Sequence, residues 1–270
     1  MLIIDSEKCV CCGDCVNECH RSALSILDNE LNWDEEKCYG CGHCMAICPR
    51  DAVFLHGDGY DVNDVEEFYN LRPRMEQVRE MIMMRRSIRS FTDMEVTDEE
   101  LDKILEAGKY SPTAENKQGN VFLVVRDIDK RQEMLDDCMG MLDSVCDDVL
   151  SGKSNKFSEI LAGNLKNVAK NWRENQEDGL FYGAPLFIFI FSDTIQDGTI
   201  AAATMTNMAY GLKLGACYIR IASDLFEDGT LMKKYNIPEG KIPSMALAIG
   251  DPQVEFFSSV PRKNPLTIIL

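Results

Sequence analysis

The spacing of hydrophobic residues predicts a series of helices from residue 75 onward. Apolar residues recur at helical intervals over Met75–Met84. Thr97-Asp-Glu-Glu100 has the capping-box pattern that begins a helix, which here extends to about Tyr110. Similar spacing predicts further helices over residues 130–150, 155–176, 199–214 and 228–236.

Short apolar runs between these helices predict buried strands. Val121–Val125 is a run of β-branched and aromatic residues, and the same character is found over Leu186–Phe191, 217–221 and 245–249. Helices and strands together predict an α/β or an α+β fold for residues 76–270.

The first 60 residues have a different composition. Nine of the twelve cysteines lie within residues 9–48, and all three histidines lie before residue 60. His56-Gly-Asp-Gly-Tyr60 closes this module, and residues 61–75 are predicted to form a linker helix. We therefore divide the chain into residues 1–60, a linker over 61–75, and a larger domain over 76–270. The larger domain contains no imidazole for a triad, a zinc site or a general base.

Charge narrows the classes of function. Lys+Arg 28 against Asp+Glu 45 gives a formal net charge of −17, which leaves no broad cationic surface for nucleic acid or an anionic membrane. The start, MLIIDSEK, has no basic region before an apolar core, and the longest apolar stretch, near Ala184–Phe191, is far below the roughly 18 residues of a membrane span. We expect a soluble, cytoplasmic protein whose cysteines serve metal or redox chemistry.

Eight cysteines form two copies of one pattern. Three cysteines two residues apart can wrap three corners of a cubane, and the fourth corner needs a ligand from elsewhere. The rule that the fourth cysteine of each run serves the other cluster gives two ligand sets: Cys9, Cys12, Cys15 and Cys48, and Cys38, Cys41, Cys44 and Cys19. At these residues the segment 1–60 closely resembles the two-cluster bacterial ferredoxins, which implies two 4Fe-4S clusters.

One alternative interpretation of these runs and two residues near them need to be considered. A zinc knuckle also uses Cys-x2-Cys pairs, but it needs neither the third nor the fourth cysteine of each run. Cys11 has no place in the pattern and is expected to be a spare thiol under the loop. His20 follows Cys19 where the ferredoxins usually have proline. We expect it to face solvent, and hypothesise that its backbone N–H gives the cluster holding Cys19 the less negative potential.

A cationic cluster follows the first helix of the larger domain. Arg85-Arg86-Ser87-Ile88-Arg89 places three cations and a hydroxyl within five residues of an acidic protein. Guanidinium groups match a phosphate well. The alternative is a solvated helix end paired with the nearby acids Asp93, Glu95 and Asp98.

Together with later motifs, this cluster resembles the nitroreductase family of FMN proteins over residues 76–270. Ser111-Pro-Thr-Ala-Glu-Asn-Lys-Gln118, Gly183-Ala184-Pro185 and Leu214–Ile219 match further family motifs. The resemblance implies an α+β domain, FMN, and a homodimer with FMN at the subunit interface. The implied FMN contacts are Arg85, Arg86, Ser87, Arg89, Asn116, Ile219, Arg220, Arg262 and Lys263.

At several positions the sequence departs from the family pattern, and the roles of the residues there stay open. Gln-Gly-Asn replaces Gln-Pro-Trp at 118–120, Tyr218 replaces tryptophan, and Arg220 replaces a common glycine. The Arg220 side chain either meets an anionic flavin or substrate, or points to solvent. No residue is assigned as catalytic, and the remaining cysteines are expected in the core: Cys138, Cys146 and Cys217.

A ferredoxin module fused to a flavin domain predicts an oxidoreductase that converts single electrons into two-electron chemistry. We expect hydride transfer to a small organic acceptor, such as a nitroaromatic, a quinone or an activated alkene, with an external ferredoxin or NAD(P)H as donor. The alternatives are an electron-transfer relay without its own substrate, a redox sensor, and a reductive dehalogenation or flavin-destruction reaction.

Overall fold

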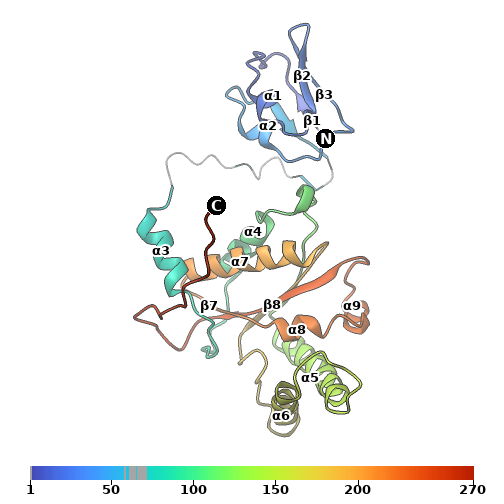
Figure 1. The fold of residues 1–270 in the computed structure, drawn as a ribbon, viewed down its shortest axis with the longest axis vertical. Helices are drawn as coiled ribbons and strands as arrows, with labels where there is room; N and C mark the ends of the chain where they lie inside the picture. The colour runs from blue at the N-terminus through green and yellow to red at the C-terminus, as the bar shows by residue number, and fades with distance from the viewer. Residues whose placement is uncertain (1, 58, 61–64, 66–71) are drawn as a thin grey trace. The chain divides into compact units, whose positions relative to one another are not determined.

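A computed structural model describes residues 2–57, 59–60, 65 and 72–270 (Figure 1). Contacts divide the chain into two compact units: unit 1 is Met1–Arg72 with Thr113–Lys117, and unit 2 is Pro73–Pro112 with Gln118–Leu270. Most of the predicted linker helix over 61–75 lies outside the described residues. Over the part of the chain that the structure describes, helices are too short or too polar to cross a membrane.

Unit 1 is built from two similar halves. Its two antiparallel sheets are β1 (Leu2–Ile4) with β4 (Val53–Leu55), and β2 (Leu24–Leu27) with β3 (Glu30–Trp33). Its short helices are α1 (Asp14–Glu18), α2 (His43–Ala46) and the 3-10 turn η1 (Ala114–Asn116). Each half contributes one short helix, α1 or α2, which contains a cysteine of that half's run.

The hydrophobic core of unit 1 is small. Its buried members are Leu2, Cys15, Leu24, Cys44 and Val53. A module of this size buries too little apolar surface for much stability of its own. Two of the five core residues are cysteines, so a group bound to their thiols would add directly to the folding free energy.

Unit 2 is organised around a four-stranded antiparallel sheet in the order β5-β6-β8-β7. The strands are β5 (Val121–Val125), β6 (Leu186–Ser192), β7 (Gly215–Tyr218) and β8 (Ile242–Gly250). Every residue of β6 is buried. Since successive side chains of a strand point to opposite faces, β6 needs a hydrophobic layer on both sides.

The two faces of β6 contact different cores. Phe187, Phe189 and Phe191 pack into one core, together with side chains of α5 and α6. The alternating aliphatic residues Leu186, Ile188 and Ile190 pack into the other core, with side chains of α4 and α7. In Figure 1 these two helix pairs lie on opposite sides of the sheet.

The helices of unit 2 vary widely in length. They are α3 (Met75–Met84), α4 (Asp98–Lys109), α5 (Ile128–Leu150), α6 (Glu159–Asn175), α7 (Ile195–Gly211), α8 (Arg220–Asp224) and α9 (Thr230–Lys234). The α+β fold is confirmed. The capping box of α4 forms as predicted: Thr97 Oγ1 accepts from the Glu100 backbone N–H at 3.2 Å, and the Thr97 N–H donates to the Glu100 carboxylate at 2.9 Å.

Most predicted helix and strand boundaries differ from the structure by a few residues, and two of these differences have a clear local cause. The helix predicted over 199–214 begins at Ile195, because the Thr194 side chain caps it by accepting from the Asp197 N–H at 3.1 Å. The strand predicted over 217–221 ends at Tyr218. Ile219 leaves the extended conformation there and starts α8, and hydrophobic character alone does not reveal that turn.

Gly215→Ala should destabilise unit 2. A Cβ at this position would lie 2.8 Å from Ile88 Cγ1 and 2.9 Å from Ile88 Cβ, and a β-branched side chain has little freedom to move away. The free energy of unfolding should fall by about 1–3 kcal/mol in denaturant titrations.

Gly211→Ala is the matched control. It adds the same methyl group at the last residue of α7, where no heavy atom of the described residues lies within 4 Å of the new Cβ. Alanine also favours the helix more than glycine does. Equal losses of stability for both variants would contradict the packing of Ile88 on Gly215.

Candidate functional site

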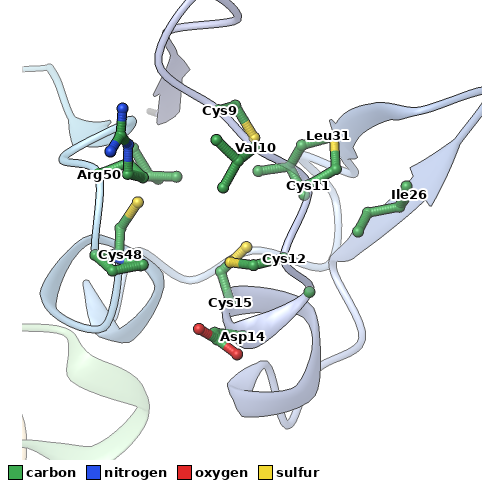
Figure 2. A pocket seen from close by; sticks show the side chains of 13 residues that line it. Cys9, Val10, Cys11, Cys12, Asp14, Cys15, Ile26, Leu31, Cys48 and Arg50 are labelled. Carbon is green, nitrogen blue, oxygen red and sulfur yellow. The ribbon is translucent and has the colours of Figure 1, made fainter.

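One group of four cysteines lines a cavity in unit 1 (Figure 2). Cys9, Cys12 and Cys15 come from the first run, and Cys48 comes from the end of the second. The structure therefore brings together the four residues of the first predicted ligand set. The fourth member crosses over from the other half because α1 and α2 pack against each other.

The second group of four lines a separate cavity. Cys38, Cys41 and Cys44 come from the second run, and Cys19 comes from the end of the first. Among the described residues, no three His, Cys, Asp or Glu side chains converge closely enough to hold a single metal ion. The thiols are instead distributed around each cavity, which is the arrangement that a polynuclear cluster uses.

Backbone geometry and burial prepare these thiols for a positively charged group. The Ala23 N–H donates to Cys19 Sγ and the Ala52 N–H to Cys48 Sγ, each at 3.3 Å. Burial raises the pKa of Cys44 to about 11. A buried thiolate at this position needs a cation beside it, and the iron of a 4Fe-4S cluster supplies that charge. The donor set therefore suits such a cluster.

Cys11 lies beside the first ligand set without joining it. It lines the same cavity, but its Sγ donates to the Asn29 carbonyl oxygen at 3.0 Å. The residue has a left-handed backbone with φ 52°. Its thiol proton is engaged across the neighbouring hairpin, and the four-cysteine set is complete without it.

The arginine motif of unit 2 lies against strand β7. Ser87 forms a parallel bridge with Ala216, and the Ile88 N–H donates to the Ala216 carbonyl oxygen at 3.1 Å. Arg85 directly follows the last residue of α3 and caps it. The motif is thus held between a helix end and a sheet edge, which fixes the backbone from which the guanidinium groups project.

Two guanidinium atoms of this motif are buried without a hydrogen-bond acceptor in the described parts of the chain, namely Arg85 Nη1 and Arg86 Nε. Another Arg86 nitrogen, Nη1, donates to the Met83 carbonyl oxygen at 2.7 Å. Leaving a buried charged donor unpaired costs more than the roughly 1–3 kcal/mol of a neutral one. An anion at this point would remove the penalty, and a phosphate has the matching geometry. The motif therefore suits the phosphate of FMN.

Several neighbours of the motif were not predicted from sequence as part of a site. The Arg85 guanidinium lies 5.7 Å from the centre of the Tyr218 ring, and the Tyr218 hydroxyl is hydrogen-bonded to Thr206 at 2.7 Å. Cys217 is buried, as expected of a core residue, yet its thiol also contacts Ser87 and Arg89. Burial raises the pKa of this thiol. The sequence signal was present in the Cys217-Tyr218 pair, which follows the matched Leu-Gly motif.

The predicted ring contacts lie in different surroundings. Asn116 belongs to unit 1, where its Nδ2 donates to the Gly40 carbonyl oxygen at 2.9 Å. The Ile219 N–H donates to the Ala246 carbonyl oxygen at 2.7 Å. Arg220 is the first residue of α8, so its N–H has no acceptor within the helix. Its side chain is 77% exposed, with Nε 3.6 Å from an Asp224 carboxylate oxygen.

The basic pair near the end of the chain is exposed. Arg262 and Lys263 lie in a segment without regular secondary structure, and neither has a hydrogen bond or an ion pair to the described residues. Within one chain the structure does not bring them to the Arg85–Arg89 motif. Their assignment to the phosphate stays a prediction.

Comparison with known families matches both parts of the chain. The model described as "Nitroreductase family" matches residues 82–251, and the model described as "4Fe-4S dicluster domain" matches residues 1–49. The first match covers the arginine motif and the whole sheet of unit 2. The second covers all eight cysteines of the two cavities.

Two curated relatives match different lengths of the chain. A protein of Archaeoglobus fulgidus, whose name gives NADH dehydrogenase/NAD(P)H nitroreductase as a proposed activity, is 43% identical over 60 residues. That match covers 22% of this chain and about a third (34%) of the relative. FMN reductase (NADPH) of Bacillus subtilis is 27% identical over 193 residues, 66% of this chain and 67% of the relative.

Solved structures share the fold of unit 2. An FMN-bound nitroreductase from Bacteroides fragilis aligns with a TM-score of 0.58 at 20% identity, over 72% of this chain and 98% of that one. An FMN-bound nitroreductase from Desulfitobacterium hafniense gives 0.55 at 22% identity, over 73% and 100%. At these identities the likeness concerns the fold.

Replacing one ligand of the first set should remove one cluster. Cys12→Ala should reduce the iron content from about eight to about four atoms per chain, because a cubane needs all four thiolates. Iron and acid-labile sulfide are measured on anaerobically purified protein. Cys11→Ala is the matched control and should keep the full content. Equal losses in the two variants would contradict the four-cysteine set around this cavity.

Replacing Arg85 should weaken FMN much more than riboflavin. Arg85→Met removes a charged donor to the phosphate, worth about 1.5–3 kcal/mol, so the Kd for FMN should rise about tenfold to a hundredfold. Riboflavin lacks the phosphate, so its Kd should stay unchanged. Both affinities are measured by flavin fluorescence quenching. Arg126→Met, at an exposed arginine paired with Asp98, should change neither. A parallel loss for both flavins would contradict the phosphate assignment.

Proposed function

Because the chain belongs to the nitroreductase family, whose members are FMN-dependent oxidoreductases, and also carries a 4Fe-4S dicluster domain, we propose that it passes electrons from the two clusters through FMN to a small organic acceptor. Nitroaromatics, quinones and activated alkenes are the acceptor classes. The observation that carries this proposal is the presence, in one chain, of two four-cysteine cavities and an arginine motif with unpaired buried donors.

The two kinds of cofactor differ in electron count. A 4Fe-4S cluster exchanges one electron at a time, whereas reduced FMN delivers two as a hydride. The chain's own residues hold and tune these groups. The eight thiolates, Cys9, Cys12, Cys15, Cys19, Cys38, Cys41, Cys44 and Cys48, are the proposed cluster ligands. Arg85 and Arg86 are proposed to neutralise the FMN phosphate, with Ser87 and Arg89 beside it.

The remaining proposed flavin contacts come from three other segments. Asn116 and the backbone at Ile219 and Arg220 are proposed to contact the ring, and Arg262 with Lys263 to contact the phosphate. The position of Arg220 at the start of α8, where the helix itself supplies no acceptor for its N–H, supports the Arg220 backbone as a donor in this group. No side chain is assigned as the proton donor to the acceptor.

Charge bears on which protein partner can dock at residues 1–60. These residues carry 11 acidic against 4 basic residues before the clusters add further negative charge. An acidic surface of this kind attracts a protein with a basic docking surface and speeds its encounter. Independently of this charge, we propose an external ferredoxin or NAD(P)H as donor, and a cytoplasmic location in which thiolates stay reduced.

The end of the chain supports a homodimer. From residue 253 onward every residue is exposed, including the apolar residues Phe257, Leu266, Ile268, Ile269 and Leu270. A hydrophobic tail of this length needs a surface to cover it. We propose that a second copy provides this surface, and sedimentation velocity of the purified protein distinguishes dimer from monomer.

The proposed electron path is tested by supplying electrons in two ways. Ferredoxin reduced with dithionite and then desalted should drive turnover of a nitroaromatic acceptor by the wild-type protein under anaerobic conditions. The Cys12→Ala/Cys41→Ala double variant, which lacks a ligand in each cavity, should be at least about tenfold slower with this donor, a loss of about 1.4 kcal/mol or more in transition-state terms.

The same variants supply the controls. Cys11→Ala should behave as wild type with reduced ferredoxin, and the double variant should keep its FMN. Flavin that is reduced only by NAD(P)H would contradict electron supply through the clusters. Rapid flavin reduction without turnover of any acceptor class would favour an electron-transfer relay.

A further inference from the structure

The two cysteine cavities share one backbone design. The second cysteine run repeats the first with identical spacing. The Ala23 N–H donates to Cys19 Sγ and the Ala52 N–H donates to Cys48 Sγ, both at 3.3 Å. Because these main-chain donors match, a difference between the two sites has to come from side chains.

Permanent positive charge is also matched. Arg21 lines the second cavity and Arg50 lines the first, each two residues after the cysteine that crosses over. Figure 2 shows Arg50 at the edge of the first cavity. Each cavity therefore gains one positive charge from its arginine, so the arginines do not cause a difference in reduction potential between the two sites.

Four lining positions differ in chemical character between the halves. At one of them the first cavity has the Cys11 thiol where the second has Gly40, and the other three form a consistent group. The first cavity has an aliphatic residue, an acid and a proline where the second has a phenol and two imidazoles. The corresponding pairs, first cavity then second, are Val10 and Tyr39, Asp14 and His43, and Pro49 and His20. The second cavity is thus richer in hydrogen-bond donors at each of these three positions.

Tyr39 directs a donor toward the second ligand set. Its hydroxyl lies within hydrogen-bonding reach of the Cys41 thiol and 2.9 Å from His20 Nε2. The Arg21 guanidinium lies 5.7 Å from the centre of its ring, which holds the phenol in place. At the same position in the first half, Val10 has no donor at all.

The carboxylate among these differing positions belongs to the first cavity. Asp14 lines the first cavity, and Figure 2 shows it beside the cysteines. In the second half the same position is His43, whose Nδ1 lies 3.2 Å from a Glu18 carboxylate oxygen, and Glu18 does not line the cavity. The extra thiol of the first cavity, Cys11, donates to the Asn29 carbonyl oxygen at 3.0 Å and also lies within hydrogen-bonding reach of the ligand Cys9.

Donors to cluster sulfurs and positive charge raise a reduction potential, and a nearby negative charge lowers it. The differences at these three positions act in the same direction, whereas the Cys11 thiol, which is a weak donor, opposes them. We propose that the cluster bound by Cys19, Cys38, Cys41 and Cys44 (the second cage) has a higher reduction potential than the cluster bound by the other four cysteines (the first cage). The two clusters then accept electrons in a fixed order. This rests on the ligand sets of the proposed function. The first cage then holds the stronger one-electron reductant.

An EPR-monitored redox titration of the full-length, FMN-loaded protein tests the order. The titration is run near pH 9, where imidazoles are neutral, so that histidine protonation cannot create the difference. Two one-electron steps are expected. At the midpoint of the upper step, the ratio of reduced to oxidised cluster should be at least about tenfold higher in the second cage than in the first, which corresponds to a separation of at least about 59 mV.

Paired variants identify which cage gives which step. Tyr39→Phe removes only the donor near Cys41 and should lower the upper midpoint while leaving the lower one in place. Asp14→Asn removes only the charge and should raise the lower midpoint alone. Tyr60→Phe should move neither, because the Tyr60 hydroxyl lies outside the cavity lining and donates to the main-chain carbonyl of the lining residue Gly40 rather than to a thiol.

The outcomes test two claims separately: the order of the two reduction potentials and the assignment of the cluster ligands. Full iron content with both clusters reduced in a single step overturns the order and leaves the ligand sets intact. A shift of the lower step in Tyr39→Phe, or of the upper step in Asp14→Asn, also overturns it. A wild-type protein that takes up fewer than about eight irons per chain overturns the ligand sets themselves.

Discussion

Burial of strand β6 on both faces is the constraint on which the architecture of unit 2 depends. Its alternating phenylalanine and aliphatic side chains require a layer of helices on each side, which α5 with α6 and α4 with α7 provide. Pairing of β8 with β6 then makes β7 the edge strand. The arginine motif bridges to β7 through Ser87, so the position of its guanidinium groups follows from the packing of a strand at which no chemistry takes place.

Unit 1 depends on a different interaction. Because the buried core cluster is small in the described part of unit 1, its two small sheets gain little from hydrophobic burial. Cluster binding by the thiols compensates for the small core. Each set of four cysteines includes one from the other half, so bound iron would link the two halves. A duplicated backbone with unequal side chains allows the two cavities to have the same ligands and different electrostatics.

The sequence was most informative where chemistry imposes a fixed spacing. The eight cysteines could be assigned to two sets from their spacing alone, since the cubane dictates both the loop and the crossover. The mixture of helices and strands and the Thr97 cap followed from periodicity and capping residues, whereas the choice of α+β over α/β came from the family resemblance. The early start of α7 at Ile195 was missed because its cap, Thr194, precedes a stretch with weak helical periodicity.

Other features could not be found without coordinates. The crowding of Gly215 by Ile88 joins residues that are distant in the sequence, as does the pairing of Tyr218 with Thr206. The unpaired state of Arg85 Nη1 is a property of burial, which composition does not report. The position of Asn116 in unit 1 likewise depends on a contact with Gly40 that local sequence does not predict.

The central claim is that the clusters and the flavin act as one electron chain toward an acceptor. Its most direct measurement mixes fully reduced protein with a nitroaromatic acceptor and follows flavin absorbance by stopped flow and the clusters by freeze-quench EPR. Electron transfer through the flavin predicts that the clusters are reoxidised as the flavin turns over, with two cluster electrons consumed for each additional two-electron reduction of acceptor. Clusters that stay reduced while the flavin is reoxidised would contradict the account.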